Sequence, residues 1–216
     1  MKYSDLIKYS IFAYSIFLLV VSTLLGASID SNILKWMSVG TSLLIFIWFS
    51  YERWIWKWPL FNKISHYYFG VPVLHGTWKG ILEFESDQNG EKGSVDIYVS
   101  INQTLTAIHI CSFFTKPSES NSIATSIYKD YKNRPQLYYL YKSEAPHGKR
   151  DTNRPHDGAV ILNIIGSPVR ELSGSYFTDR KGAGQIKLQY YNRKASETLE
   201  EAIQLCESNQ TSETPE

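Results

Sequence analysis

Cysteine is scarce in this chain, and so is any excess of charge of one sign. Cys111 and Cys206 are the only cysteines. They are too few for a disulfide framework and lack the spacing of zinc ligands, so we expect two reduced thiols and no metal site. The 22 Lys and Arg residues are balanced by 21 Asp and Glu residues, which leaves a formal net charge of +1. A chain so nearly neutral is not expected to bind a nucleic acid polymer.

Catalytic motifs are also missing. The sequence contains no G-x-S-x-G segment, no carboxylate pair with an assignable geometry and no metal triad, and these are the usual signatures of a hydrolase. We therefore expect no catalytic residues and no cofactor. A barrel enzyme remains as the third of three hypotheses.

Charge is absent from two long stretches near the N-terminus. No charged residue lies between Lys8 and Asp30, and at about 1.5 Å per residue this stretch would cover roughly 30 Å of helix, the thickness of a bilayer core. A second uncharged run covers residues 36–51 and ends in a cluster of Trp and Tyr that is typical of a membrane interface. The sequence thus predicts a transmembrane helical hairpin and then a juxtamembrane connector. The hairpin covers residues 1–60, with its two spans at about 9–29 and 34–55. The connector covers residues 61–75.

A secretory signal peptide is the alternative for the first span, because Lys2 and Lys8 form a basic start and residues 25–28 resemble a cleavage site. The second span follows too closely for a secreted domain. Basic residues flank the two ends of the hairpin, whereas only Lys35 lies on the other side, so the positive-inside rule places both termini in the cytoplasm. Small residues spaced four apart favour close helix packing, within one hairpin or between protomers. These candidates for membrane assembly are Ser22, Gly26, Ser38 and Ser42.

After residue 75 the sequence changes to short β-type runs separated by turn signals. Several runs alternate between apolar and polar residues with a period of two. We predict a small closed eight-stranded antiparallel β-barrel over residues 76–194, similar in architecture to lipocalin and fatty-acid-binding barrels, with a β-sandwich as the alternative. The eight runs begin near Thr77, Ser94, Leu105, Ser122, Gln136, Gly158, Val169 and Gln185.

The segment from His156 to Tyr191 shows the pattern most clearly, because three runs are joined only by short turns and form a meander. In its middle run Leu172, Gly174, Tyr176 and Thr178 share a face that we expect to point inward.

Two segments outside the meander have expectations of their own. Residues 118–130 could form a short helix instead of a strand. Residues 195–216 are expected to form a short helix with Ser196 as its N-cap, followed by an acidic disordered tail.

Several motifs occur in an order that resembles a known family. The predicted hairpin is followed by GTWKG from Gly76, LYYLYK from Leu137, HDGAVIL from His156 and LSGSYFTDRKGAGQIKL from Leu172. This order resembles the two-transmembrane β-barrel effectors of bacterial CBASS antiphage systems. In those proteins the barrel senses a cyclic dinucleotide that is made by a partner CD-NTase.

The resemblance implies an effector without catalytic chemistry in the bacterial inner membrane. It implies three partners, namely a cyclic dinucleotide, further copies of the chain and the lipid bilayer. Ligand binding would promote oligomerisation, and the clustered membrane segments would disrupt the membrane and kill the infected cell. The runner-up hypothesis is a membrane-anchored lipocalin-like carrier of a lipid or another small apolar ligand.

A cyclic dinucleotide needs flat aromatic surfaces beside a few fixed hydrogen-bond donors. Tyrosine rings can stack on its bases, and an arginine can hold a phosphate through two hydrogen bonds. A structural alternative stays open for each group: the tyrosines can simply pack the core, Arg180 can pair with Asp179 or Glu171, and His156 can be held by a neighbouring Asp. The predicted ligand-binding residues are Arg180, Tyr176, Thr178, Tyr141, Tyr139, His156 and Gln103.

Overall fold

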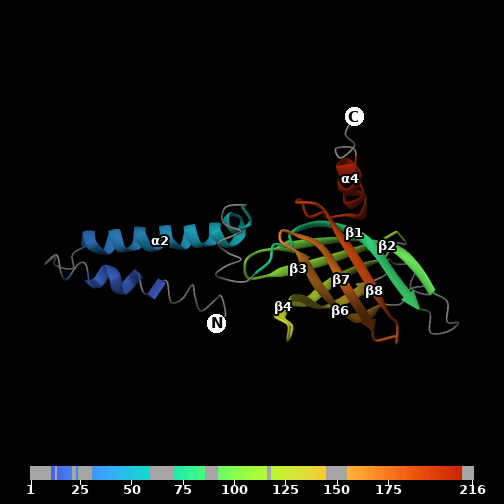
Figure 1. The fold of residues 1–216 in the computed structure, drawn as a ribbon. Helices are drawn as coiled ribbons and strands as arrows, with labels where there is room; N and C mark the ends of the chain where they lie inside the picture. Colours follow the sequence, from blue (N-terminus) through green and yellow to red (C-terminus); the bar gives the residue numbers. More distant parts are fainter. Residues whose placement is uncertain are drawn as a thin grey trace. The chain divides into compact units, whose positions relative to one another are not determined.

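The computed structural model describes residues 11–12, 14–20, 23, 31–58, 71–85, 92–115, 118–144 and 155–210. The chain divides into two compact units (Figure 1). The first unit is helical and consists of Met1–Gly70 with Thr104–Thr106, and the second holds the strands and consists of Val71–Gln103 with Ala107–Glu216.

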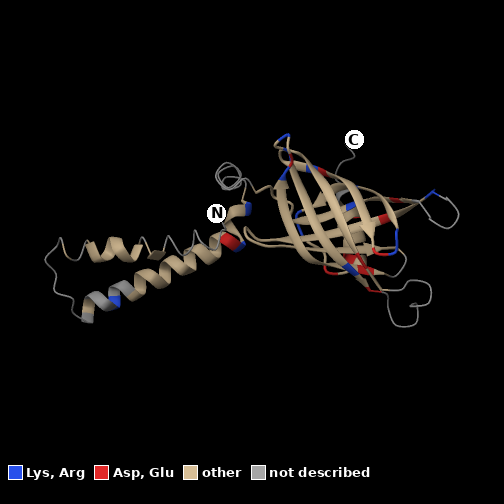
Figure 2. Cartoon of the chain, turned by 90° about the horizontal axis from the view of Figure 1, so that it is seen from below, with Lys and Arg blue, Asp and Glu red and all other residues tan. Residues whose placement is uncertain are grey.

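The first unit is built on the helix α2, Ser31–Arg53, which is followed by the short helix η1, Ile55–Lys57. The charged residues of α2 lie toward the two ends of the helix (Figure 2), and they are Lys35, Glu52 and Arg53. Between them many apolar side chains are exposed. This is the stretch that suggested the second membrane span. No helix in the described part of the chain combines the length and the apolar character that crossing a bilayer requires.

Two helical segments of the first unit approach each other at a small residue. A side-chain carbon added at Gly40 would lie only 2.0 Å from the hydroxyl of Tyr14, so the absence of a side chain at Gly40 is what permits the contact. The predicted assembly residues Ser38 and Ser42 are exposed on α2. Ser22 and Gly26 lie outside the described residues, as do 1–10 and 24–30 of the hairpin and 59–70 of the hairpin end and connector.

The C-terminal end of α2 holds residues 104–106, which belong to the same unit. The carboxylate of Glu52 accepts hydrogen bonds from the hydroxyls of Thr104, at 3.4 Å, and of Thr106. The carbonyl of Glu52 also accepts a hydrogen bond from the N–H of Leu105 at 3.1 Å. Three hydrogen bonds to one residue therefore fix this turn.

Eight antiparallel strands close into a barrel in sequence order, because β1 pairs with both β2 and β8. The predicted closed barrel is confirmed, and the sandwich alternative is wrong. The segment 118–130 contains a strand rather than a helix, since residues 119–129 pair with residues 135–144, with one bulge between Ser122 and Ala124. The strands are β1 Gly76–Glu85, β2 Lys92–Gln103, β3 Ile108–Phe114, β4 Glu119–Lys129, β5 Pro135–Glu144, β6 His156–Gly166, β7 Val169–Thr178 and β8 Ala183–Asn192.

The direction of the strands gives the barrel two distinct ends. We call the end where the chain enters at Gly76 the base, and it also carries the β2–β3, β4–β5 and β6–β7 links. The other end, which we call the rim, carries the β1–β2, β3–β4, β5–β6 and β7–β8 links. Arg180, in the β7–β8 link, is therefore a rim residue.

Alternate residues of the strands point into the barrel, as the period of two predicted. Leu172 and Tyr176 of β7 are buried, and so are Ile97, Val99 and Ile101 of β2. Trp78 in the GTWKG segment is fully buried, and its indole N–H donates to the carbonyl of Leu74 at 2.9 Å. Burying one large apolar side chain contributes about 1.5–3 kcal/mol, so this interior is the main source of stability.

The helix α4, Leu199–Gln210, packs on the outside of the barrel, where its Ala202 and Cys206 contact Tyr98 and Phe113. The predicted N-cap is wrong. The hydroxyl of Thr198 accepts the capping hydrogen bond from the N–H of Glu201 at 3.2 Å.

Ser196 is held by the barrel instead of the helix, since its N–H donates to the hydroxyl of Thr77 at 3.1 Å. The short helix expected within residues 195–216 is present and continues to Gln210. Residues 211–216 lie outside the described part of the chain.

Candidate ligand-binding site

Three tyrosines gather inside the half of the barrel that lies toward the rim. Tyr139 and Tyr141 lie on β5 and Tyr176 lies on β7, and all three side chains are buried. The ring centroids of Tyr139 and Tyr141 are 6.3 Å apart. Strand β6 pairs with both β5 and β7, so aromatic side chains flank it on both sides. The predicted tyrosines are thus brought together.

Two glycines leave the space that these rings occupy. Gly158 is paired with Tyr141, and a side-chain carbon at this glycine would lie 2.4 Å from the tyrosine ring. Gly184 is paired with Tyr176, and a side-chain carbon there would lie 2.6 Å from that ring. Sequence reasoning did not identify Gly158 and Gly184 as site residues. A glycine paired with a tyrosine on the next strand would have identified them, but such pairs can be recognised only when the register between the strands is known.

A row of buried hydroxyl groups lies beside the tyrosines. Ser112 on β3 is paired with Ser120 on β4, which is paired with Ser143 on β5, and Ser143 is paired with His156. The three serines are buried, and the hydroxyl of Ser112 forms a hydrogen bond with that of Tyr139. Hydroxyl groups both donate and accept hydrogen bonds. Sequence reasoning missed these serines, although small polar residues in the inward phase of a strand are a usable signal.

The tyrosine hydroxyls remain protonated over a wide range of pH. Burial raises the pKa of Tyr141 to about 12, and the neighbouring Tyr176 and Asp179 add to this effect. Burial also raises the pKa of Tyr139 and of Tyr176. At neutral pH these groups are therefore neutral hydrogen-bond donors that can serve a ligand without carrying charge themselves.

His156 and Thr178 border the cluster on the rim side. The ring of His156 lies edge-on to Tyr141, with centroids 6.1 Å apart, and is half-buried. The hydroxyl of Thr178 accepts a hydrogen bond from the N–H of Gly182 at 3.0 Å, which fixes it in the β7–β8 turn. Both predicted residues thus lie within the same region as the tyrosines.

Arg180 is exposed at the rim, and its Nη2 donates to the carbonyl of Pro155 at 3.1 Å. The alternative for Arg180 is a salt bridge with Asp179 or Glu171. Glu171 instead lies 3.7 Å from the ammonium group of Lys187, and within the described residues no ion pair joins Arg180 to either carboxylate. The guanidinium of Arg180 therefore stands at the mouth of the barrel, tied to the β5–β6 link.

Gln103 lies at the base, at the opposite end from Arg180. Its Oε1 accepts from the N–H of Leu74 at 2.6 Å, and its Nε2 donates to the carbonyl of Pro72 at 2.9 Å. The side chain is fully buried. The structure does not bring Gln103 to the other predicted residues, and its amide instead binds the chain that enters the barrel.

Other features of the chain are less suited to binding a dinucleotide. A groove of about 460 Å³ lies on the outer faces of β1 and β8, between the side chains of Lys79, Glu83 and Lys187. It contains residues of both charges and one aromatic ring, that of Tyr191. No group of three metal-ligating side chains occurs within the described residues.

The fold and the interior cluster define a closed β-barrel with an aromatic and polar half, an arrangement suited to a small ligand. Residues 69–190 match the family described as Cap15, cyclic dinucleotide receptor domain. CD-NTase-associated protein 15 of Staphylococcus schleiferi is 27% identical to this chain over 153 residues, which are 71% of this chain and 78% of that protein. The chain therefore belongs to the Cap15 family of cyclic dinucleotide receptor domains. The family resemblance that the motif order suggested is confirmed.

Proposed function

We propose that this protein is a CBASS effector whose barrel binds a cyclic dinucleotide against Tyr139, Tyr141 and Tyr176. One observation carries the proposal: a domain of a cyclic dinucleotide receptor family holds three buried tyrosines beside a row of hydroxyl groups. The family itself is one of receptors, which fits an effector with no catalytic chemistry of its own.

The chemistry of the ligand matches these groups. Each base can stack on a tyrosine ring, which is typically worth about 1–3 kcal/mol per base. The hydroxyls of Ser112, Ser120 and Ser143 and the ring of His156 can reach polar edges and ribose oxygens. Arg180 can hold a phosphate at the rim through charge-assisted hydrogen bonds.

The membrane part of the proposal is supported by the sequence of the first sixty residues. Their two uncharged stretches favour a helical hairpin in the bacterial inner membrane, and the distribution of Lys and Arg favours cytoplasmic termini. A barrel in the cytoplasm would meet the messenger made by a CD-NTase. Ligand binding would then drive copies of the chain to oligomerise, and their membrane segments would disrupt the bilayer.

Calorimetric titration of the full chain in detergent tests the binding step. Cyclic di-GMP, cyclic di-AMP and cyclic GMP–AMP are added in turn, and palmitate serves as the apolar comparison. We expect one dinucleotide to bind, and we expect Tyr141→Leu to weaken that binding while palmitate gives no heat. Saturable binding of palmitate without binding of any dinucleotide would refute the proposal and favour the lipid-carrier hypothesis.

A further inference from the structure

An unbroken row of apolar residues crosses the outside of the barrel. Successive strand partners from β4 to β8 are Ala124, Leu140, Ala159, Phe177 and Ala183, and we call them the outer row. Each alternates with inward residues and so faces outward. Leu140 is 49% exposed and Phe177 is 50% exposed.

The outer row has a charged row on its rim side. Lys142 is paired with Asp157, and the N–H of Asp179 donates to the carbonyl of Asp157 at 3.0 Å. With Arg180 next in sequence, this border carries both signs of charge. It therefore does not repel a second surface of the same kind, because each charge can find its opposite there.

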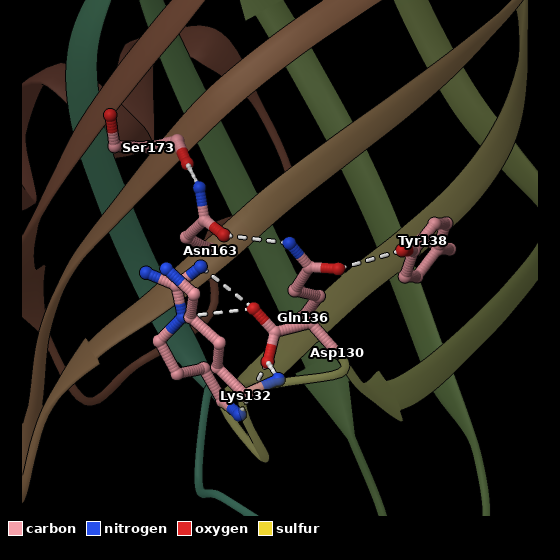
Figure 3. Close-up of polar contacts among 7 residues, drawn as sticks. Asp130, Lys132, Gln136, Tyr138, Asn163 and Ser173 are labelled. Carbon is pink, nitrogen blue, oxygen red and sulfur yellow. Dashed lines mark hydrogen bonds and ion pairs between the residues drawn. The ribbon is translucent and has the colours of Figure 1, made fainter.

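On the base side of the outer row, outward polar side chains of neighbouring strands are joined by hydrogen bonds (Figure 3). The hydroxyl of Tyr138 donates to Gln136 at 2.7 Å, and the amide of Gln136 donates to Asn163 at 2.8 Å. The amide of Asn163 donates to the carbonyl of Ser173 at 3.2 Å. This ladder links β5, β6 and β7 on the outer surface beside the outer row.

An apolar row of this kind is unusual on the solvent side of an antiparallel sheet, where polar residues are expected. At another place on the barrel the chain covers outward apolar residues itself, since α4 packs over Tyr98 and Phe113. The closed barrel offers no free strand edge, so a partner that binds the outer row does so through side chains and not by adding a strand.

We propose that the outer row is the surface on which a second copy of this chain packs in the ligand-bound assembly. The inference rests on the proposed function, because copies anchored in one membrane are related by a rotation about the membrane normal. Such a rotation keeps every residue at its own height. When the rotation is two-fold, it also places the outer row of one copy against that of its neighbour, and the charged border, with Lys142 and Asp157, level with its own counterpart.

The small size of the outer row explains why the contact would depend on the membrane. A stable interface buries about 800 Å² on each partner, and a row of five side chains, three of them alanines, falls well short of this area. Tethering in a membrane raises the effective concentration of the neighbour and makes a weak contact sufficient. The outer row thus orients copies that the membrane segments hold together.

Assembly of the full chain in detergent or nanodiscs tests the inference. The mass of the particle is measured by light scattering before and after cyclic di-GMP, cyclic di-AMP or cyclic GMP–AMP is added, and binding is measured by calorimetry on the same samples. The test variant is Leu140→Lys with Phe177→Lys. The matched control is Ile81→Lys with Ile165→Lys, which changes two outward residues that are 48% and 45% exposed but lie outside the outer row.

We expect both variants to bind the ligand as the wild type does, and only the test variant to lose the ligand-dependent rise in mass. Normal binding with an unchanged rise in mass would refute the inference alone. A wild-type chain that binds no dinucleotide, or that binds without assembling, would refute the proposed function and the inference with it.

A second variant keeps the test decisive if the lysines unfold the barrel. Ala159 lies at the middle of the outer row, and Ala159→Cys is a small change. Under a mild oxidant this variant should cross-link between copies when ligand is present, whereas Ile81→Cys and the wild type should not. Equal cross-linking of Ala159→Cys and Ile81→Cys would contradict the proposed contact.

Discussion

Replacing Gly158 by alanine should weaken ligand binding while the barrel stays folded. The new side-chain carbon would lie 2.4 Å from the ring of Tyr141, and the atoms it meets are the ring atoms at the far end of that side chain. The ring can therefore swing away, at a cost typical of overpacking, about 1–3 kcal/mol. Moving the ring removes one stacking surface worth about 1–3 kcal/mol, so affinity should fall roughly 5- to 150-fold.

Calorimetry with the dinucleotide that binds the wild type measures this loss, and thermal melting measures the stability. Gly174→Ala is the comparison, because its new carbon would lie 2.0 Å from the main-chain carbonyl oxygen of Ile161, which cannot swing away. That variant should lose stability first. A double-mutant cycle with Tyr141→Leu completes the test, since Gly158→Ala should have little further effect on affinity once the ring is gone. Unchanged affinity in Gly158→Ala would refute the role of Tyr141 as a stacking surface.

Four further predictions concern the rim, the tyrosines and the membrane segments. Arg180→Ala should keep the melting temperature within a few degrees, because the side chain is exposed, but should cost about 1.5–3 kcal/mol of binding energy; normal binding would remove Arg180 from the site. Burial raises the pKa of the three interior tyrosines above their unfolded values. The stability that they confer is therefore complete below a pH of about 10 and is lost as the pH rises toward about 12, the pKa of Tyr141. A stability profile that stays flat from about pH 9 to about pH 12 would contradict this prediction. A fragment of residues 71–210 should bind the ligand yet be harmless in cells that express the CD-NTase, and toxicity would argue against membrane disruption. An alkaline phosphatase fused after Glu216 should be inactive, and periplasmic activity would contradict the proposed topology.

The alternation of residues predicted the barrel, because inward and outward faces can be read from a period of two without any knowledge of pairing. It placed Tyr176 on the inward face correctly. The pairing of Gly158 with Tyr141 could not be read in this way, since it depends on the register between β5 and β6. The same limit hid the serine row, whose members come from three strands.

Gln103 shows why the correct face is not enough to identify a site residue. It points inward, as its phase predicted, but phase does not say at which end of the barrel a residue lies. The direction of β2 places it at the base, where backbone groups of the entering chain use its amide. The N-cap was wrong for a related reason, because the contact of Ser196 with Thr77 is long-range and leaves no local pattern.

The hold of Gln103 on Pro72 and Leu74 has a mechanical consequence. Two side-chain hydrogen bonds fasten the incoming chain to the last residue of β2, at positions four and two residues before β1 begins at Gly76. Tension applied to the chain ahead of Pro72 would thus be borne by β2 as well as by β1.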